Sequence, residues 1–111
     1  MINPIEIAKK FKALQDDKNS YIIESLQLAS DFLGQIKKMS EEKFIKDESA
    51  LLDIIWELDI KYQQTVKIIN DSRPDDFPYL APNGFLNLLS LVTPSTFEYY
   101  QKYKNNLKNK N

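Results

Sequence analysis

Two residue types that carry much of enzyme chemistry are missing, because the 111-residue chain contains neither cysteine nor histidine. Without cysteine there can be no disulfide bond, thiolate metal site or cysteine nucleophile. Without histidine the chain lacks the usual general base and transition-metal ligand near neutral pH, so Ser-His-Asp, Cys-His and histidine-metal sites are impossible. We therefore expect a protein that is not an enzyme and that holds no metal and no cofactor.

Arginine is also scarce, since Arg73 is the single arginine in a chain with 15 basic residues. Arginine supplies the bidentate contacts by which proteins read bases and phosphates, so its scarcity argues against direct nucleic-acid binding. No apolar run approaches the roughly 18 residues that a membrane span requires. A helix start at Asn3 and Pro4 follows the first residue almost at once. We expect a cytoplasmic protein without a membrane span.

The residues that are present favour one folded domain. Hydrophobic residues make up 42% of the chain and aromatic residues 12%, which is far from the composition of a disordered segment. A chain of this length can bury one continuous core. We expect a single helical domain over residues 1–107, followed by a frayed tail of lysine and asparagine over residues 108–111.

Apolar residues recur at intervals of three and four in the first part of the chain, a pattern typical of helices. Asn3 followed by Pro4 predicts the N-cap and first residue of a first helix. Ser20 is the expected cap of a second helix that runs to about residue 38. Ser40 is the next candidate cap.

The third helix is predicted to be long and central. A short turn at Phe44 and Ile45 is expected before it, Asp47 or Ser49 is its candidate cap, and it ends at about Asn70. Its apolar residues form two stripes, which is typical of a helix with neighbours on both sides. We therefore expect the first two helices on one flank of this central helix and the C-terminal helices on the other.

Three prolines interrupt the helical pattern between residues 71 and 82. A fourth helix is predicted from about Asn83, and because it is apolar on nearly every side we expect it to be buried. Thr93 and Pro94 end it and begin a fifth helix, which reaches about Leu107. The predicted fold class is all-α, a compact bundle of four to five helices with a long central third helix and a proline-rich loop before the C-terminal helices.

The net charge of −1 conceals an uneven distribution along the chain. Residues 40–76 carry ten acidic and five basic groups, whereas residues 77–111 carry four lysines and one glutamate. The middle of the chain is therefore acidic. An acidic, arginine-poor helical surface is complementary to a basic protein, although the same charges can also serve only to keep a helix soluble.

Three acids of the third helix, Asp53, Glu57 and Asp59, form the first candidate site. Paired carboxylates can bind a divalent cation or act as acid and base. Metal sites in helical bundles combine such carboxylates with histidine, which this chain lacks. A solvated helix face is the favoured interpretation, and we assign these acids no catalytic role.

The proline-rich loop is the second candidate, because it combines Asp71, Asp75 and Asp76 with Phe77 and Tyr79. The order of ligands in a calcium-binding loop is missing. Rigid aromatic side chains flanked by charge are typical of protein-binding hot spots. The favoured interpretation is that Phe77, Tyr79 and Leu80 simply cover the end of the bundle, and an interface role is the alternative.

A third candidate lies near the C-terminus, where Tyr99, Tyr100 and Tyr103 alternate with Lys102 and Lys104. Such a pattern can bind single-stranded nucleic acid through stacking and phosphate contacts. Tyr100 and Tyr103 also fit the buried stripe of the fifth helix. The favoured interpretation is therefore part of the core followed by a solvated tail.

These observations favour a non-catalytic inhibitor, a small immunity or anti-defence protein of bacterial or phage origin. It would neutralise a basic toxin or nuclease by covering the active site. One alternative is a structural or adaptor module that forms a homodimer through exposed aromatic residues of the fifth helix. Another is an immunity protein associated with an anionic membrane through its lysine-rich tail. The predicted partner-binding residues are Asp53, Glu57, Asp71, Asp75, Asp76, Phe77 and Tyr79.

Overall fold

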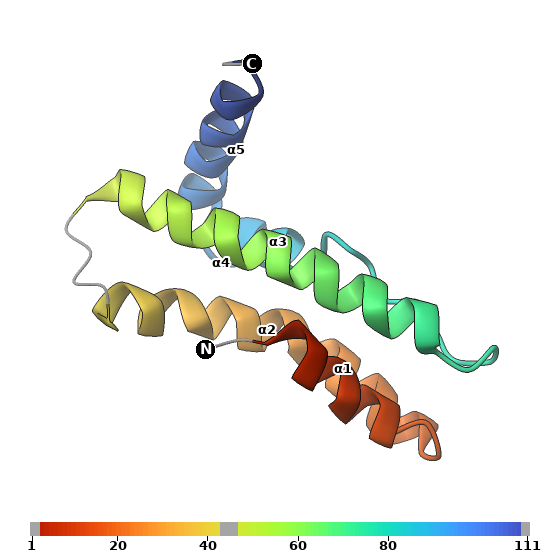
Figure 1. The fold of residues 1–111 in the computed structure, drawn as a ribbon. Coiled ribbons are helices and arrows are strands. Elements are labelled where there is room, and N and C mark those ends of the chain that lie inside the picture. The colour runs from red at the N-terminus through yellow and green to blue at the C-terminus, as the bar shows by residue number, and fades with distance from the viewer. Residues whose placement is uncertain (1–2, 43–46, 110–111) are drawn as a thin grey trace.

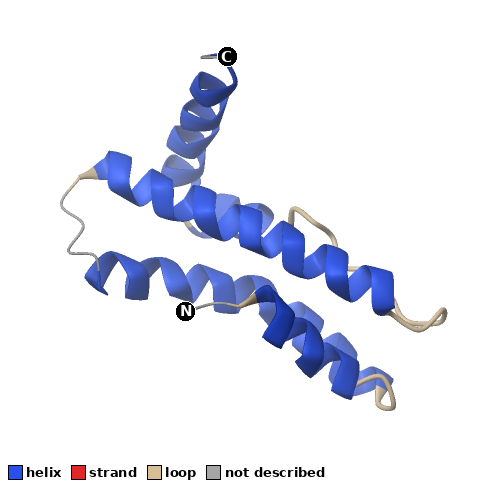
Figure 2. Ribbon diagram, viewed as in Figure 1, coloured by secondary structure: helices blue, strands red, loops and turns tan. Residues whose placement is uncertain are grey.

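The computed structural model describes residues 3–42 and 47–109, and every regular element within these ranges is a helix (Figures 1 and 2). The helices are α1 (Pro4–Ala13), α2 (Lys18–Glu42), α3 (Glu48–Ser72), α4 (Gly84–Val92) and α5 (Pro94–Asn109). The predicted all-α bundle is confirmed, with a long third helix and a non-helical segment before the last two helices. None of the described helices is long and apolar enough to cross a membrane.

The starts of α1 and α3 are those that the sequence predicts. The Asn3 side chain accepts a hydrogen bond from the Ile5 N–H at 3.0 Å. The Asp47 side chain accepts one from the Ala50 N–H at 2.9 Å, which selects Asp47 over the other candidate cap of α3. Each bond satisfies a backbone donor that the first turn of a helix leaves without a partner.

Two predicted caps of the N-terminal half are wrong. Asp17, rather than Ser20, caps α2, because its carboxylate accepts hydrogen bonds from the Ser20 N–H at 3.2 Å and the Ser20 hydroxyl at 2.7 Å. The bond from the Ser20 hydroxyl lowers the pKa of Asp17. Ser40 lies inside α2, and its hydroxyl donates a hydrogen bond to the Ile36 carbonyl at 2.7 Å. The hydroxyl therefore has its partner within the helix and caps no helix start. The expected turn at residues 44–45 lies outside the described residues.

The third helix is central, as predicted, because α3 contacts each of the other four helices. The predicted separation of the flanks is wrong, since α2 packs against α4 as well as against α3. Phe32 of α2 explains this contact, because its ring lies 5.1 Å from the Tyr62 ring of α3 and 6.2 Å from the Phe85 ring of α4. One aromatic cluster therefore joins three helices.

The fourth helix is less buried than its composition predicts. Phe85, Leu86 and Leu89 are in the core, but Leu91 is 80% exposed and Val92 is 56% exposed. α4 packs against α2, α3 and α5, while Leu91 in its last turn lies on the surface. Apolar composition therefore places one face of α4 in the core and leaves the other on the surface.

The molecule is elongated, with extents of 44 × 30 × 24 Å. In Figure 1, α2 and α3 run alongside one another, and α5 leads away from them with the C-terminus at its far end. The α1–α2 turn and the 73–83 loop lie at the opposite end of the molecule from α5. The candidate site residues lie toward the two ends of α3, some beside α5 and the others beside the 73–83 loop.

Candidate partner-binding site

The predicted site residues do not form one surface. Asp53 and Glu57 lie near the start of α3, whereas Asp71 lies in its last turn and the remaining four lie in the 73–83 loop. A helix rises 1.5 Å per residue, so Asp53 and Asp71 are about 27 Å apart along the helix axis. The structure thus brings together the loop residues with Asp71 and leaves Asp53 and Glu57 at the other end.

Of the two acids near the start of α3, Asp53 contacts α5. The Tyr103 hydroxyl of α5 donates a hydrogen bond to the Asp53 carboxylate. This bond raises the pKa of Tyr103 to about 12. Glu57 forms an ion pair with Lys61 of the same helix at 3.3 Å. Asp53 is exposed, so its carboxylate remains partly accessible to solvent.

The solvated-face interpretation is wrong for Asp59, which is only 2% exposed. Its carboxylate accepts hydrogen bonds from the Tyr100 hydroxyl at 2.9 Å and the Gln63 amide at 3.0 Å, and Lys104 lies 3.7 Å away. Burial raises the pKa of Tyr100 well above its ordinary value, and the Asp59 carboxylate raises it further. Asp59 therefore anchors α5 from within the core.

The loop at the other end of α3 is fixed by Arg73. One guanidinium nitrogen lies within hydrogen-bond distance of the Pro74, Asp75 and Phe77 carbonyls, at 2.9, 3.1 and 3.0 Å. The guanidinium carbon also lies 3.4 Å from the centre of the Tyr79 ring. A planar cation can donate hydrogen bonds in its plane while it stacks on an aromatic ring. One side chain therefore fixes both the path of the loop and the position of Tyr79.

Two amide side chains complete the attachment of the loop. The Asn70 side chain donates to the Leu80 carbonyl at 3.0 Å and accepts from the Leu80 N–H at 2.8 Å. The Gln15 amide donates to the Ser72 carbonyl at 2.7 Å, which ties the α1–α2 turn to the end of α3. These bonds satisfy backbone groups that no regular structure serves, and they define the path of the loop.

The two aromatic residues of the loop have different environments. Phe77 is 7% exposed and packs edge to face on Tyr21, with ring centres 4.8 Å apart. The expectation of an accessible Phe77 is therefore wrong, because the ring fills the core between α2 and the loop. Tyr79 is 71% exposed. Tyr79 is thus the aromatic side chain of the loop that a partner can reach.

An apolar groove of about 420 Å³ lies beside Tyr79, between α2 and the loop. We call it the Tyr79 groove. Its α2 wall includes Ile22 and the 77% exposed Leu26. Tyr62 and Gly84 also line it, and a Cβ atom at Gly84 would lie 2.6 Å from the Tyr62 hydroxyl oxygen. Glycine at this position therefore lets α4 approach Tyr62 closely.

The acids near the Tyr79 groove are on the surface. Asp75 and Asp76 are exposed, and the contact between Asp76 and Lys18, at 3.9 Å, joins two solvated side chains. Asp71 pairs with Lys67 at 3.0 Å, again in solvent. Exposed pairs of this kind contribute little stability and exchange readily for other partners. The carboxylates can therefore turn toward a basic protein at small cost.

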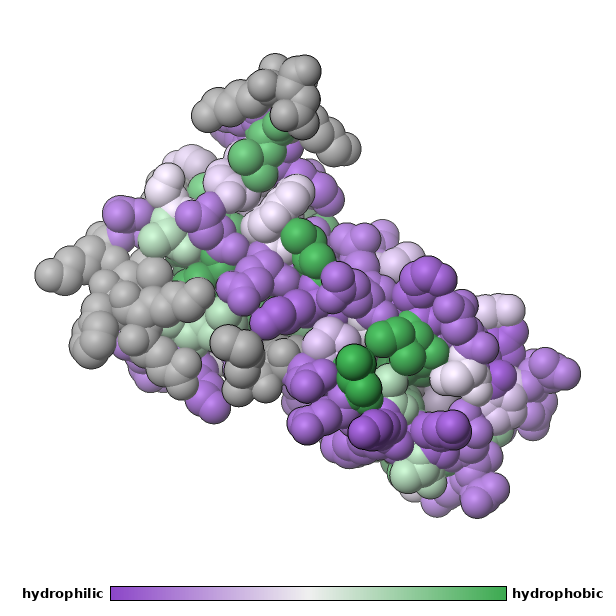
Figure 3. All heavy atoms as spheres, in the orientation of Figure 1, coloured by the Kyte–Doolittle hydropathy of each residue, from purple (hydrophilic) through white to green (hydrophobic). Residues whose placement is uncertain are grey.

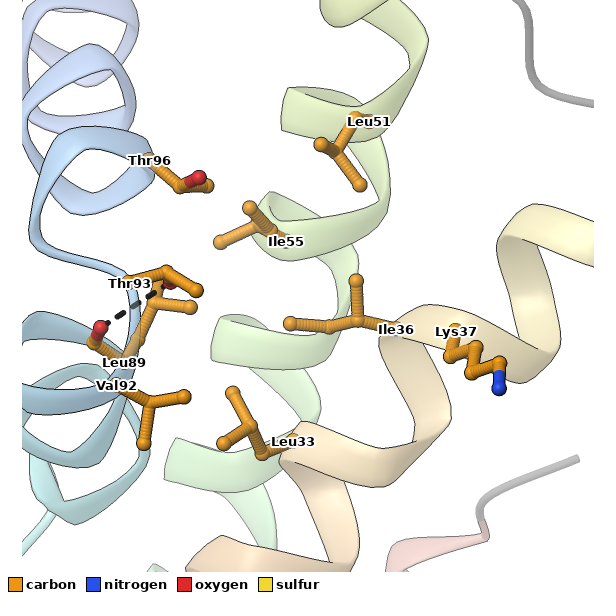
Figure 4. Close-up of a pocket in the computed structure, with 9 residues that line it drawn as sticks. All are labelled: Leu33, Ile36, Lys37, Leu51, Ile55, Leu89, Val92, Thr93 and Thr96. Atoms are coloured by element: carbon orange, nitrogen blue, oxygen red, sulfur yellow. Dashed lines mark hydrogen bonds between the residues drawn. The ribbon is translucent and has the colours of Figure 1, made fainter.

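A second apolar hollow, of about 260 Å³, lies where α2, α3 and the α4–α5 corner meet. Figure 4 shows Leu33 and Ile36 of α2, Ile55 of α3 and Val92 of α4 directed toward it. Thr93 lies at its edge, with its hydroxyl bonded to the Leu89 carbonyl at 3.3 Å. Its lining is mainly aliphatic, with Lys37, Thr93 and Thr96 as its polar members.

Sequence reasoning missed Arg73 and the α2 side chains of the groove. The signal for Arg73 was its rarity, because it is the single arginine among many lysines and it precedes a proline-rich segment. Ile22 and Leu26 gave no signal, since they share a helical period with core residues of α2. Among the described residues, no group of three or more acids could hold a metal ion.

Comparison of the chain with known protein families, curated proteins and solved structures finds no match. The functional proposal therefore rests on the geometry of the surface. That geometry defines an all-α protein with an exposed tyrosine, stacked on Arg73, beside an apolar groove and surface carboxylates.

Proposed function

We propose that this chain is a non-catalytic protein-binding domain that uses the Tyr79 groove to bind a basic protein. Within that class we propose an immunity or anti-defence protein, which neutralises a toxin or nuclease by covering its active site. The observation that carries the proposal is the exposed Tyr79 ring stacked on Arg73. A side chain held rigidly before binding loses little entropy when a partner arrives, which favours affinity.

The chemistry of the groove defines the partner. An apolar side chain of the partner fits against Ile22 and Leu26, and its lysines or arginines meet Asp75 and Asp76. A standard interface buries about 800 Å² on each partner, equivalent to a disc of about 16 Å radius. A site centred on Tyr79 therefore includes Asp71 and leaves out Asp53, which lies about 27 Å from Asp71 along α3.

The test is an affinity capture in which the tagged protein is exposed to lysate from its own source. Three baits are compared by mass spectrometry at moderate salt: the wild type, Tyr79→Ala and the control Tyr99→Ala. Tyr99 is a suitable control because it is a half-exposed tyrosine on α5, remote from the groove. We expect a basic protein that the wild type and Tyr99→Ala retain and that Tyr79→Ala loses.

Direct titration with the captured protein then measures the effect. Loss of a central aromatic side chain from an interface weakens binding by about 30-fold or more. The Asp75→Lys, Asp76→Lys double variant should slow association, with an effect that shrinks at high salt. Equal binding by wild type and Tyr79→Ala would place the interface elsewhere, and capture of nothing but the bait itself would remove the inhibitor proposal.

The alternative of self-association through α5 has less support. Tyr100 is fully buried and Tyr103 is bound to Asp53, so Tyr99 is the one tyrosine of the described part of α5 that is more than half exposed. A single such side chain offers a small apolar surface. Loss of self-association in Tyr99→Ala, with no effect of Tyr79→Ala, would favour this alternative.

A further inference from the structure

A second surface, on α1 and the end of α3, has the opposite charge from the 73–83 loop. Figure 3 shows a hydrophobic patch over α1 and the C-terminal half of α3, surrounded by hydrophilic residues. Two isoleucines are exposed here, Ile5 at 61% and Ile68 at 38%. Hollows of about 380 and 220 Å³ adjoin this pair, and both isoleucines line both hollows. We call this surface the lysine-rimmed strip.

The core does not require these isoleucines. α1 buries Ala8 and Phe11, and the end of α3 buries Val66 and Ile69. Ile5 lies outside this buried pair of α1 and instead shares a helix face with Lys9 and Lys12, at spacings of four and seven residues. The strip therefore combines aliphatic and basic side chains on one exposed face.

The charges around the two hollows are mainly positive. Lys9 and Lys12 line one hollow and Lys67 lines the other. Lys67 pairs with Asp71, but Lys9 and Lys12 form no ion pair within the described parts of the chain. The neighbouring Lys10 is directed to Glu24 of α2 instead. Two lysine charges are thus available beside the apolar hollows.

We propose that the lysine-rimmed strip binds an acidic amphipathic helix of a partner protein. The apolar side chains of such a helix, three or four residues apart, enter the hollows beside Ile5 and Ile68. Its carboxylates meet Lys9 and Lys12. Hollows accept protruding side chains, whereas a lipid surface calls for protruding side chains on the protein and for more than two free lysines. This proposal concerns a different surface from the Tyr79 groove and does not depend on it.

The test uses a synthetic 14-residue helical peptide of leucine and glutamate, with leucine at helical spacing, and a matched peptide in which lysine replaces glutamate. Each is titrated into the ¹⁵N-labelled full-length chain. We expect the glutamate peptide to shift the backbone amides of residues 5–12 and 64–72, with a dissociation constant below about 1 mM. The lysine peptide should cause no shift in these segments.

Charge-reversal variants test whether Lys9 and Lys12 contact the carboxylates of the peptide. The Lys9→Glu, Lys12→Glu double variant should bind the glutamate peptide at least about tenfold more weakly. The control Lys37→Glu, Lys38→Glu changes two exposed lysines of α2, away from the strip, and should bind as the wild type does. Circular dichroism establishes that both variants fold. Tyr79→Ala should leave peptide binding unchanged, which separates this proposal from the proposed function.

Several outcomes would overturn the proposal. They are no binding up to about 1 mM, equal binding of the lysine peptide, equal binding by the Lys9→Glu, Lys12→Glu variant, or shifts confined to other helices. Binding to phosphatidylserine vesicles in place of the peptide would identify a membrane surface instead. Amide shifts at the strip on dilution of the free protein would identify a second copy of the chain.

Discussion

The two ends of α3 hold their neighbours by different chemistry. In the N-terminal half of α3, the Asp53 and Asp59 carboxylates accept hydrogen bonds from the tyrosine hydroxyls of α5, as in the pair of Asp59 and Tyr100. At the end of α3, the side chains of Arg73 and Asn70 bind backbone groups of the 73–83 loop. The difference follows from the backbone. A helix satisfies its own N–H and C=O groups and can be attached only through side chains, whereas a loop must find partners for its backbone.

This difference has a consequence for stability. The attachment of α5 includes two tyrosines whose pKa values are raised in the folded state, so it is sensitive to alkaline pH. The attachment of the loop relies on an arginine, which stays charged, and an amide, which does not titrate. Conditions that change charge should therefore affect the α5 end more, and substitutions that change shape should affect the loop end more.

Alkaline pH should have the largest effect, because tyrosines of both ends respond to it. Burial raises the pKa of Tyr21, Tyr62 and Tyr100, and the bond to Asp53 raises that of Tyr103 from 10.0 to about 12. A pKa raised by folding means that the neutral form stabilises the folded state. This contribution is complete below pH 10 and is lost as the pH rises through the folded value, between 10 and about 12 for Tyr103.

Urea unfolding followed by circular dichroism, at pH values from about 8 to about 11, measures this loss. The control Tyr103→Phe removes one titrating group at the α5 end and should show a shallower decline above pH 10. A free energy of unfolding that stays constant over this range would contradict the account of the tyrosines.

Asp59→Ala should lower the free energy of unfolding by about 3 kcal/mol, since it leaves the buried Tyr100 hydroxyl without its partner. Asp53→Ala is the matched control, because Asp53 is on the same helix, also accepts from a tyrosine of α5 and is exposed. Its loss should stay below about 1 kcal/mol. Equal losses for the two variants, measured by urea unfolding, would mean that burial does not distinguish the two bonds.

Arg73→Lys should lower the free energy of unfolding by about 2 kcal/mol. An ammonium group carries the same charge but cannot both reach three carbonyls and stack on Tyr79. Lys67→Ala, which removes an exposed ion pair nearby, is the control and should change stability by less than about 0.5 kcal/mol. If Arg73→Lys is as stable as the wild type, charge alone fixes the loop.

The smallest effect is a gain in stability. The Tyr21 hydroxyl is buried and has no hydrogen-bond partner among the described residues. Tyr21→Phe keeps the ring contacts with Phe11 and Phe77 and should raise the free energy of unfolding by about 1 kcal/mol. Tyr100→Phe removes the hydrogen bond to Asp59 and should instead lower the free energy of unfolding. A destabilising Tyr21→Phe would show that the hydroxyl is satisfied.

Local patterns predicted much of the fold. Asn3 and Asp47 cap their helices by accepting a hydrogen bond from a backbone N–H two or three residues later. Pro94 begins a helix because its ring fixes the backbone φ angle at a helical value. Ser20 and Ser40 misled because a serine hydroxyl can also bond a carbonyl one turn back or assist a stronger cap. The contact of α2 with α4 depends on Phe32 meeting Phe85, which no local pattern contains.

The candidate site was harder to predict, because neighbouring residues have different environments. Phe77 and Tyr79 are two residues apart, yet the first fills the core and the second stands in solvent. Asp59 is buried because Tyr100, 41 positions later, completes its hydrogen bonds. Composition and helical periodicity cannot predict these environments, since each depends on contacts with side chains that are distant in the sequence.

The Asp59 carboxylate also determines how α5 is aligned along α3. Tyr100 and Lys104 lie one helical turn apart, and both reach the same oxygen of Asp59. A displacement of α5 by one turn, about 5.4 Å, would place Thr96 and Tyr100 there and leave a negative charge buried without its cation. Apolar stripes tolerate several alignments of two helices, but the Asp59 carboxylate is matched by a tyrosine followed four residues later by a lysine, which α5 offers only at Tyr100 and Lys104. Asp59 therefore selects the alignment of α5 in addition to holding it.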